Sequence, residues 1–333
     1  MAVVMFHYTT RYSEMYGHRS PLPFEFRYGN LGVELFFGIS GFVIFMTLDR
    51  TKSLTDFVVS RASRLFPAYW TAILFTTIAV NTAGMNELTR SPWEVAINAT
   101  MLQHFLGVAP VDGVYWTLAV ELTFYGAMAL LWKLGALRNI EPILLTWMSL
   151  TWVWAFSPSV LGGEPSWLLG SLIIQEHIPY FAIGMAAYRL KSGVGDRRWI
   201  GAVFGVALVT IGVCDELSYL VVALVSTAVL TAIAFGKVPA LAAKPLVWGG
   251  TISYSLYLLH ESIGFAILKK LESAGAAPAL SVAVTVGAMV ALAAGVTYLV
   301  ERPALRAAKR WHGIRRTRRD SPIDLRAEPV QLP

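Results

Sequence analysis

The sequence predicts an all-α fold: a polytopic membrane helix bundle of about ten transmembrane helices. Hydrophobic residues make up 56% of the 333 positions and charged residues only 14%, against roughly 25% charged residues in an average soluble protein. The apolar residues gather in nine windows with few or no charges, each near the length that crosses a bilayer. The same composition excludes disorder and collagen. A single cysteine, Cys214, excludes a disulfide framework.

The nine windows define the predicted spans in chain order. They cover residues 31–48, 66–83, 116–132, 142–157, 172–188, 199–214, 218–236, 248–268 and 279–300. A hydrocarbon core needs about 20 helical residues, and tilt or boundary error accounts for the shorter windows. Residues 94–107 include the polar residues Glu94, Asn98, Gln103 and His104, so an interfacial or re-entrant segment is predicted there.

The segment Met1–Tyr8 is apolar but too short to cross a membrane by itself. Arg11, Arg19 and Arg27 follow it, and the absence of a preceding basic stretch argues against a secretory signal. We expect either a short segment packed within the bundle or the outer end of a first helix that begins before Met1. The count of about ten includes this helix, truncated at its N-terminus.

Loop charges predict the orientation of the chain. If residues 49–65 face the cytoplasm, the later loops alternate, and twelve Lys or Arg residues lie inside against six outside. Residues 301–333 add nine Lys or Arg and four acids to the inside. Because cytoplasmic loops carry an excess of Lys and Arg, we expect a bacterial inner-membrane protein with a cytoplasmic C-terminus.

Two units are predicted: a transmembrane domain over residues 1–303 and a basic, poorly ordered cytoplasmic tail over residues 304–333. A basic tail can bind nucleic acid. After a long apolar segment, however, such a tail is more typical of a membrane face that contacts anionic lipid. We therefore expect membrane lipid, and not nucleic acid, as a partner of the tail.

Ionisable residues inside apolar windows are costly, so they mark candidate functional positions. They are His7, Glu34, Glu121, Glu176, His177, His260 and Glu261. Glu121 either orients a base or a substrate hydroxyl, or forms a structural ion pair between helices. His7 is either a general base, because an ordinary imidazole titrates near working pH, or an interfacial hydrogen-bonding residue.

A second set of polar residues surrounds His260. Ser253, Tyr257 and Glu261 share one helical face, with Tyr254 and His260 on neighbouring faces. This pattern predicts either a polar seam that lines a cavity or a set of hydrogen bonds between helices.

Small and basic residues mark two further segments. The patch Gly38-Ile39-Ser40-Gly41 favours close helix packing, which can expose Ser40 to a cavity. Arg61 and Arg64 share a helical face at the predicted cytoplasmic edge. They either bind a phosphorylated substrate or anchor the helix at the membrane face. The sequence contains no Cys and His residues at the spacing of a zinc site, no nucleotide-binding loop and no His-Glu-x-x-His motif. We therefore expect no metal and no bound cofactor.

Five segments, in chain order, form a recognisable set. They are Gly32-Val33-Glu34-Leu35-Phe36-Phe37-Gly38-Ile39-Ser40-Gly41-Phe42, Arg61-x-x-Arg64-Leu65-x-Pro67-x-Tyr69, Tyr115-Trp116-Thr117-Leu118-Ala119-Val120-Glu121-Leu122-x-Phe124-Tyr125, Ser253-Tyr254-Ser255-Leu256-Tyr257-Leu258-Leu259-His260 and Glu301-Arg302-Pro303. Together they resemble the motifs of the acyltransferase-3 family of bacterial polytopic membrane proteins. Each motif is weak alone, but five in order, at helix positions that fit the topology, are specific.

The resemblance implies a membrane O-acyltransferase that moves an acyl group, which we expect to be acetyl, from acyl-CoA to a hydroxyl of a sugar or glycolipid. It implies His7 as catalytic base or transient acyl carrier, and Glu121 as the residue that holds the imidazole or the acceptor. Arg61 and Arg64 would bind the phosphates of CoA, which acts as donor substrate. The other candidate cavity residues are Glu34, Ser40, Trp116, Tyr125, Tyr257 and His260, with hydroxyls near Ser40 and Tyr257 stabilising developing charge.

The family pattern places a basic residue, ten others and then a histidine in the first helix. If His7 is that histidine, the basic residue falls before Met1, so we expect either an upstream start or a shortened protein. Two alternatives to the enzyme stay open. One is a transporter or flippase for a lipid-linked saccharide, which would use the same polar seam. The other is an inactive, truncated relative.

Overall fold

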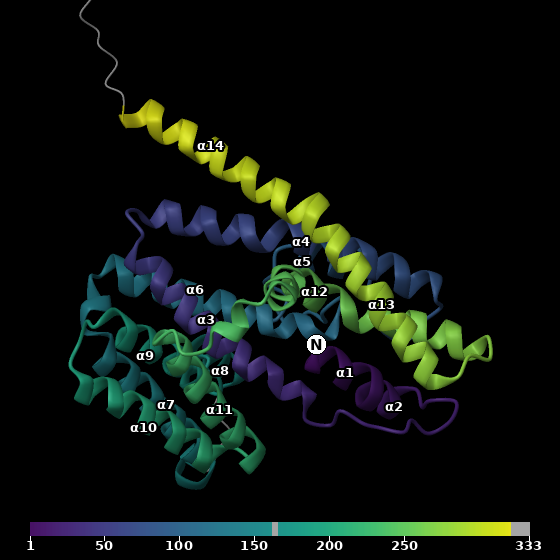
Figure 1. Ribbon diagram of the computed structural model, residues 1–333, viewed down its shortest axis with the longest axis horizontal. Helices are drawn as coiled ribbons and strands as arrows, with labels where there is room; N and C mark the ends of the chain where they lie inside the picture. The colour runs from purple at the N-terminus through teal and green to yellow at the C-terminus, as the bar shows by residue number, and fades with distance from the viewer. Residues whose placement is uncertain (162–165, 321–333) are drawn as a thin grey trace, which may run out of the picture.

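The computed structural model describes residues 1–161 and 166–320, and all regular structure in these ranges is helical (Figure 1). The α-helices are α1 Ala2–Phe6, α2 Tyr12–Met15, α3 Gly32–Asp49, α4 Leu54–Thr82, α5 Pro92–Asn98, α6 Trp116–Lys133, α7 Ile140–Leu161, α8 Trp167–Ile173, α9 Ile178–Ser192, α10 Arg197–Cys214, α11 Leu217–Ala234, α12 Lys244–Ser273, α13 Pro278–Val296 and α14 Arg302–Asp320. Two π-helical turns, η1 His7–Arg11 and η7 Thr297–Glu301, interrupt otherwise continuous helices. The predicted all-α fold is confirmed.

Six helical segments of the described ranges are long and apolar enough to cross a membrane. They are Gly29–Asp49, Leu54–Thr82, Gly113–Lys133, Arg197–Cys214, Leu217–Ala234 and Pro278–Trp311. Large apolar side chains such as Leu74, Val213 and Leu224 are exposed on these helices. Exposed apolar faces of this kind suit contact with lipid. The chain is a multi-pass membrane protein, and the predicted count of about ten spans is not confirmed.

Two predicted boundaries are wrong for identifiable reasons. Helix α4 begins twelve residues before the predicted window, because the Ser53 hydroxyl accepts a hydrogen bond from the N–H of Asp56 and caps the helix there. Pro67 consequently lies inside α4 and not near its start. The predicted span 172–188 is broken, because Ile174 adopts a left-handed φ of 45° between α8 and α9.

Residues 94–107 do not form a spanning helix. The seven-residue α5 begins at a capping box in which the Ser91 and Glu94 side chains bond each other's backbone N–H. The Asn98 side chain at the end of α5 then accepts a hydrogen bond from the N–H of Val111 at 2.9 Å. This bond closes the loop formed by residues 99–110. The absence of a spanning helix here is as predicted, and the interfacial or re-entrant position of the segment stays a prediction.

Contacts between loops show that the helices alternate between two ends of the bundle. The Tyr188 hydroxyl donates to Asp49 at 2.8 Å. Arg189 pairs with the buried Glu141 at 2.6 Å and donates to the carbonyl of Arg138 at 3.0 Å. The basic end is defined by the connections that include or adjoin these residues: 50–53, 134–139 and 193–196. It also includes residues 235–243, because they follow α11, whose other end adjoins the cavity residue Asp215. The opposite connections are termed the cavity end: residues 17–31, 83–115, 174–177 and 215–216.

Close packing of α3 against α9 forms the centre of the bundle. A methyl group at Gly184 would overlap the carbonyl oxygen of Gly38, and one at Gly41 would overlap the carbonyl oxygen of Phe181. The Phe124 ring of α6 stacks on Phe181 with centroids 3.9 Å apart. The predicted packing role of the small-residue patch is confirmed, and it brings the first turns of α3, α6 and α9 together.

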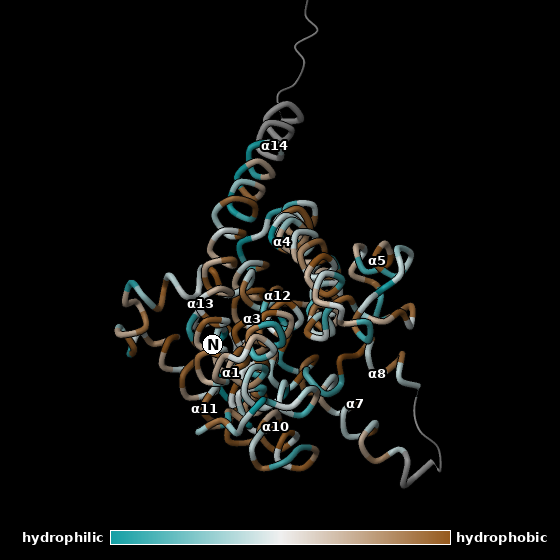
Figure 2. The backbone as a smooth tube through the Cα atoms, turned by 90° about the vertical axis from the view of Figure 1, so that its right-hand side faces the viewer, coloured by the Kyte–Doolittle hydropathy of each residue, from teal (hydrophilic) through white to brown (hydrophobic). Residues whose placement is uncertain are grey.

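Helix α14 continues α13 through η7 and extends away from the bundle (Figures 1 and 2). The predicted tail, residues 304–333, is therefore helical through Asp320. Residues 321–333 of that tail lie outside the described ranges.

Candidate active site

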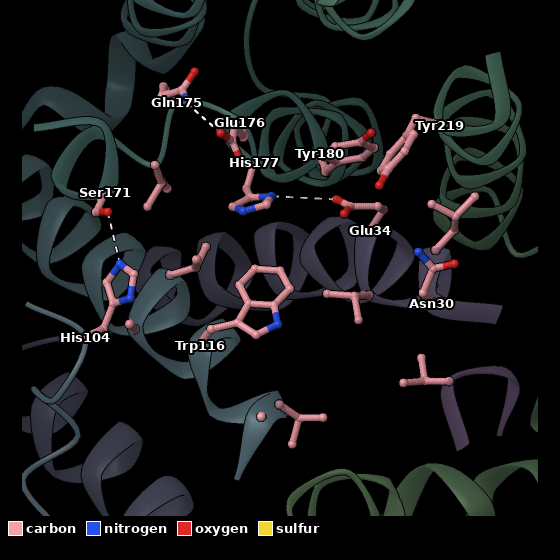
Figure 3. A pocket seen from close by; sticks show the side chains of 18 of the residues that line it. Asn30, Glu34, His104, Trp116, Ser171, Gln175, Glu176, His177, Tyr180 and Tyr219 are labelled. Atoms are coloured by element: carbon pink, nitrogen blue, oxygen red, sulfur yellow. Dashed lines mark hydrogen bonds and ion pairs between the residues drawn. The ribbon is translucent and has the colours of Figure 1, made fainter. Parts of the chain in front are cut away.

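A cavity of about 940 Å³ lies at the cavity end of the bundle (Figure 3). Its walls come from α1 and η1, from the first turns of α3, α6, α9 and α11 with the connections that precede them, and from parts of α7, α8 and α12. Its volume is at the upper end of the roughly 300–1,000 Å³ that is typical of small-molecule sites. The residues predicted from the sequence that line it are His7, Glu34, Trp116, Glu176, His177, Tyr257 and Glu261.

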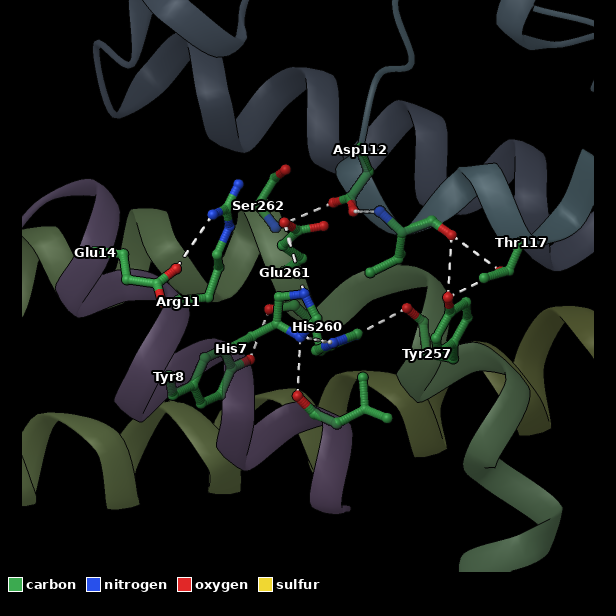
Figure 4. Close-up of polar contacts among 12 residues, drawn as sticks. His7, Tyr8, Arg11, Glu14, Asp112, Thr117, Tyr257, His260, Glu261 and Ser262 are labelled. Carbon is green, nitrogen blue, oxygen red and sulfur yellow. Dashed lines mark hydrogen bonds and ion pairs between the residues drawn. The ribbon is translucent and has the colours of Figure 1, made fainter. Parts of the chain in front are cut away.

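His7 lies in η1 and contacts His260 of α12, although 253 positions separate them in the sequence (Figure 4). His7 Nδ1 lies 2.9 Å from the carbonyl oxygen of Val3 and 3.2 Å from His260 Nε2. The two rings meet edge to face with centroids 4.8 Å apart. His260 Nδ1 lies 2.8 Å from the carbonyl oxygen of Tyr257, and the Tyr8 hydroxyl donates to the carbonyl of His260 at 2.7 Å.

Two carbonyl oxygens determine which ring nitrogens carry hydrogen. A carbonyl only accepts, so the Nδ1 atoms of His7 and His260 both donate. In neutral rings, His260 Nε2 then holds a lone pair, and the single His7 Nδ1–H is shared between that lone pair and the Val3 carbonyl oxygen. The remaining nitrogen, His7 Nε2, keeps its lone pair, and His7 lines the cavity while His260 is fully buried. The pair therefore presents one basic nitrogen to the cavity.

A carboxylate stands beside that nitrogen. Glu261 Oε1 lies 3.7 Å from His7 Nε2, and a methyl group at Gly113 would collide with the Glu261 carboxylate. The buried Asp112 accepts from the N–H of Ser262 at 3.0 Å. Burial, with the negative charge of Glu261, raises the pKa of Asp112 well above its usual range. Burial also raises the pKa of Glu261. Because two neighbouring carboxylates resist ionising together, the pair tends to keep a proton, and its remaining negative charge stabilises an imidazolium at His7.

Glu121 is not brought to His7. It is buried in α6, where it accepts hydrogen bonds from the hydroxyls of Ser40, at 3.2 Å, and Tyr125. Neither Ser40 nor Tyr125 lines the cavity. The expectation that Glu121 holds the His7 imidazole therefore finds no contact in the structure, because His260 makes the bond that fixes the ring.

The two arginines of the basic motif differ in their surroundings. Arg64 pairs with the buried Glu301 and lies 5.6 Å over the Tyr254 ring. Arg61 lies 6.0 Å over the Tyr125 ring, and its Nε has no hydrogen-bond partner among residues 1–161 and 166–320. Arg64 is held by a direct ion pair. Arg61 lies near Glu121 and donates to the Ser60 hydroxyl at 3.3 Å, but it forms no direct ion pair with a described carboxylate, so it keeps more N–H donors for an anion.

Comparison with known proteins identifies the chain. A family model described as an acyltransferase domain matches residues 1–300. The chain belongs to this acyltransferase family. The resemblance carried by the five motifs is confirmed, and the chain is an acyltransferase.

Three relatives are similar to this acyltransferase. The exopolysaccharide production protein ExoZ of Rhizobium meliloti is 28% identical over 86% of this chain and 92% of its own length. Nodulation protein 10 of Rhizobium leguminosarum is 32% identical over 38% of this chain and 41% of its own. An O-acetyl transferase of Shigella phage Sf6 is 26% identical over 60% of this chain and 62% of its own. No solved structure matches the chain.

Sequence reasoning missed several polar residues of the acyltransferase cavity region, and three of them matter most for its charge and hydrogen bonding. Asp112 precedes Gly113 at the start of a span, where an acid is equally typical of a helix cap. Asp215 and Tyr180 line the cavity, but nothing in their local patterns separates them from other loop acids and helix tyrosines. In the described ranges, no group of three His, Cys, Asp or Glu side chains is placed to hold a metal ion.

Stability of the acyltransferase should depend on pH through Asp215. Partial burial at the cavity, with the charges of Glu34 and Glu176, raises the pKa of Asp215 to about 6, above about 3.9 in the unfolded chain. The ionised carboxylate therefore destabilises the fold above about pH 6, and this cost disappears as the pH falls from about 6 toward 4. Asp215→Asn should raise the melting midpoint in detergent at pH 8 and converge with wild type near pH 4.5. Glu216→Gln, with the same net charge, is the control, and a parallel response would contradict the assignment.

A second expected result concerns Glu121. Glu121→Gln keeps the shape of the side chain but removes the charge that the Ser40 and Tyr125 hydroxyls and the nearby Arg61 face. Hydrogen bonds to charged groups contribute about 1.5–3 kcal/mol, so acyl transfer should fall about tenfold to a hundredfold. The rate is measured in membranes with matched protein levels, with Glu25→Gln on an exposed loop as control. Unchanged transfer would remove a charged role for Glu121.

Proposed function

We propose that this acyltransferase moves an acyl group, first of all acetyl, from acyl-CoA to a hydroxyl of a saccharide or glycolipid. The observation that carries the proposal is the lone pair of His7 Nε2, which faces the cavity beside the Glu261 carboxylate. One relative is named for exopolysaccharide production and another as an O-acetyl transferase. Those names support a saccharide acceptor and an acetyl donor.

The chemistry follows from the hydrogen-bond pattern of the two histidines. His7 Nε2 takes the proton of the acceptor hydroxyl while its oxygen attacks the thioester carbonyl. The ester C–O bond forms, the C–S bond breaks, and the imidazolium returns its proton to the leaving thiolate. Glu261 stabilises the imidazolium, and His260 holds the ring through His7 Nδ1–H. The same lone pair could instead carry the acyl group for one step.

The basic end offers a place for the donor. A second cavity of about 510 Å³ is lined there by Met46, Thr47, Arg50, Thr51, Lys52, Asp56, Phe57 and Ser60. Arg61 lies 6.0 Å over the ring of Phe57 and so borders this cavity. Guanidinium and ammonium groups bind phosphates. We propose that Arg61, Arg50 and Lys52 bind the CoA phosphates. Arg64, on the same helix α4 as Arg61, stabilises the position of that helix through its ion pair with Glu301.

A polar row along α6 connects the two ends. Thr117, Glu121 and Tyr125 follow one another at four-residue spacing and so lie on one face of the helix. Thr117 bonds the Tyr257 hydroxyl at 2.8 Å near the cavity, and Tyr125 stacks with Arg61 toward the basic end. We propose that the acyl arm of the donor follows this row, which at 1.5 Å per residue is about 12 Å long.

The proposed orientation places the basic end in the cytoplasm. Twelve Lys or Arg residues belong to that side of the predicted topology, against six on the other, before α14 is counted. Acyl-CoA would then enter from the cytoplasm of a bacterial inner membrane, with the C-terminus on the same side. The acceptor would reach His7 from the other face.

Labelled acetyl-CoA supplied to membranes that contain the full chain tests the function. We expect label in a saccharide or lipid-linked saccharide fraction together with release of CoA, and neither in membranes without the chain. A flippase would move saccharide with no CoA release. An inactive relative would insert but give neither product. Absence of transfer from acetyl-CoA and from longer acyl-CoA, with inserted protein and acceptor-rich lysate present, would refute the proposal.

A further inference from the structure

One wall of the main cavity carries polar side chains that the proposed acyl transfer leaves unused (Figure 3). They are termed the acidic lobe: Glu34, Glu176, His177, Tyr180, Asp215 and Tyr219. They come from α3, from the turn and first residues of α9, and from the connection and first turn of α11. Three separate parts of the chain therefore converge on this wall.

Two buried members of the acidic lobe lack a hydrogen-bond partner. Tyr180 is only 2% exposed, and its hydroxyl bonds nothing in the described part of the chain. Glu34 is 7% exposed, and its Oε2 lies 3.9 Å from His177 Nδ1, beyond hydrogen-bond range. Buried polar groups are nearly always satisfied. A ligand that both donates and accepts hydrogen bonds would satisfy the Tyr180 hydroxyl and the Glu34 carboxylate together.

The charge of the cavity restricts that ligand. Its lining holds four carboxylates and one arginine: Glu34, Glu176, Asp215, Glu261 and Arg11. Arg11 already pairs with Glu14 at 3.2 Å. A negatively charged ligand at the acidic lobe would face like charges in a partly desolvated site, whereas hydroxyl groups would donate to the carboxylates.

An aromatic surface adjoins the acidic lobe. Trp116 lines the cavity, is 40% exposed, and lies 5.4 Å from the His177 ring. The next residue of α6, Thr117, bonds Tyr257 of the helix that carries Glu261. Trp116 thus lies between the acidic lobe and the wall of His7. A flat apolar face beside hydrogen-bonding groups matches a sugar ring, whose faces are apolar and whose rim carries hydroxyls.

We infer that the acidic lobe binds a second saccharide unit of the acceptor, one without negative charge, beside the unit whose hydroxyl faces His7. Trp116 stacks against this unit, and Glu34 and Tyr180 bond its hydroxyls. A cavity of about 940 Å³ has room for more than one ring. The inference rests on the proposed transfer to a saccharide. It specifies that the acceptor has at least two saccharide units and that the unit at the acidic lobe carries no negative charge.

Binding of oligosaccharide in the absence of acyl-CoA tests the inferred second saccharide site. The probe is oligosaccharide cut from the envelope polysaccharides of the cell that makes the chain and separated into a neutral and an acidic pool. A ligand of the folded state raises its melting midpoint. The neutral pool should raise the midpoint of the full chain in detergent, and of His7→Ala equally, while the acidic pool should not. Glu34→Gln with Tyr180→Phe should abolish the shift, and Tyr28→Phe, an exposed control, should keep it.

Glu34→Gln and Tyr180→Phe remove no hydrogen bond seen in the structure, so both should fold. Each single variant, measured alone, gives the same test if the double variant does not fold. Asp215→Asn with Glu34→Gln should admit the acidic pool. An equal shift from the acidic pool in wild type, an unchanged shift in the double variant, or no shift from the neutral pool would each overturn the inference. If acyl transfer continues in those cases, the proposed acyl transfer to a saccharide stands and only the second saccharide site is refuted. If the neutral pool binds but no acyl transfer occurs, the proposed acyl transfer is refuted and the saccharide site is not.

Discussion

A His7→Ala protein is expected to lose acyl transfer by about 10²–10⁴-fold, the range that a positioned general base contributes. The effect is large because, of the two histidines His7 and His260, only His7 presents a nitrogen lone pair to the cavity. Truncation also leaves Glu261 with no imidazolium to stabilise. The measurement is transfer of label from acetyl-CoA in membranes with equal amounts of inserted protein.

Two controls separate chemistry from structure in that experiment. His104→Ala alters another histidine of the same cavity, which contacts Ser171 at 3.0 Å, and should keep most of the rate. Added imidazole should restore part of the rate to His7→Ala, because the truncated side chain leaves space open to the cavity. Wild-type transfer by a correctly inserted His7→Ala protein would remove His7 from the chemistry.

Gly184→Ala is expected to destabilise the bundle by about 1–3 kcal/mol or more, the cost of overpacking a close-packed interior. The new methyl group would overlap the backbone of α3 at Gly38. Backbone cannot move aside as a flexible side chain can, so α3 and α9 must separate. Because α3 carries Glu34 and His177 directly precedes α9, the same separation should widen the cavity and lower acyl transfer.

Gly126→Ala is the matched control for Gly184→Ala. Gly126 lies in the middle of α6, and a methyl group there meets no atom within 4 Å, so better helix propensity should make it neutral or slightly stabilising. Melting midpoints and detergent-resistant folded fractions compare the two variants. Equal stability of both proteins would mean that α3 and α9 do not approach as closely as the structure has them.

Hydropathy predicted most of the helices. A helix that contacts lipid must be apolar whatever its neighbours are, so its own sequence shows where it lies. The windows that became α3, α6, α10 and α11 are within a few residues of the structure. It failed at residues 172–188, where the turn at Ile174 is a backbone event inside an apolar run. The length of a charge-free window also could not separate spanning helices from the short helix α9, which is buried from Ile178 to Arg189.

The site was predictable as a set of residues but not as a set of contacts. His7, His260 and Glu261 were each recognisable as ionisable groups in apolar surroundings. Their meeting depends on how η1 crosses α12, which is set by packing between distant segments such as Tyr8 against Gly264. For the same reason the resemblance could imply that Glu121 holds the imidazole or the acceptor, but its contact with Ser40 depends on helix packing.

The π turn that carries His7 makes the position of this side chain sensitive to the number of residues in the segment. A π turn contains one residue more than an α turn, and each residue rotates a helix by about 100°. Loss of any one residue between His7 and Arg11 would restore a regular helix and turn the imidazole away from His260, while Tyr12 stayed in place. When relatives are aligned across residues 7–11, a single-residue gap therefore signals a changed reaction centre more reliably than any substitution there.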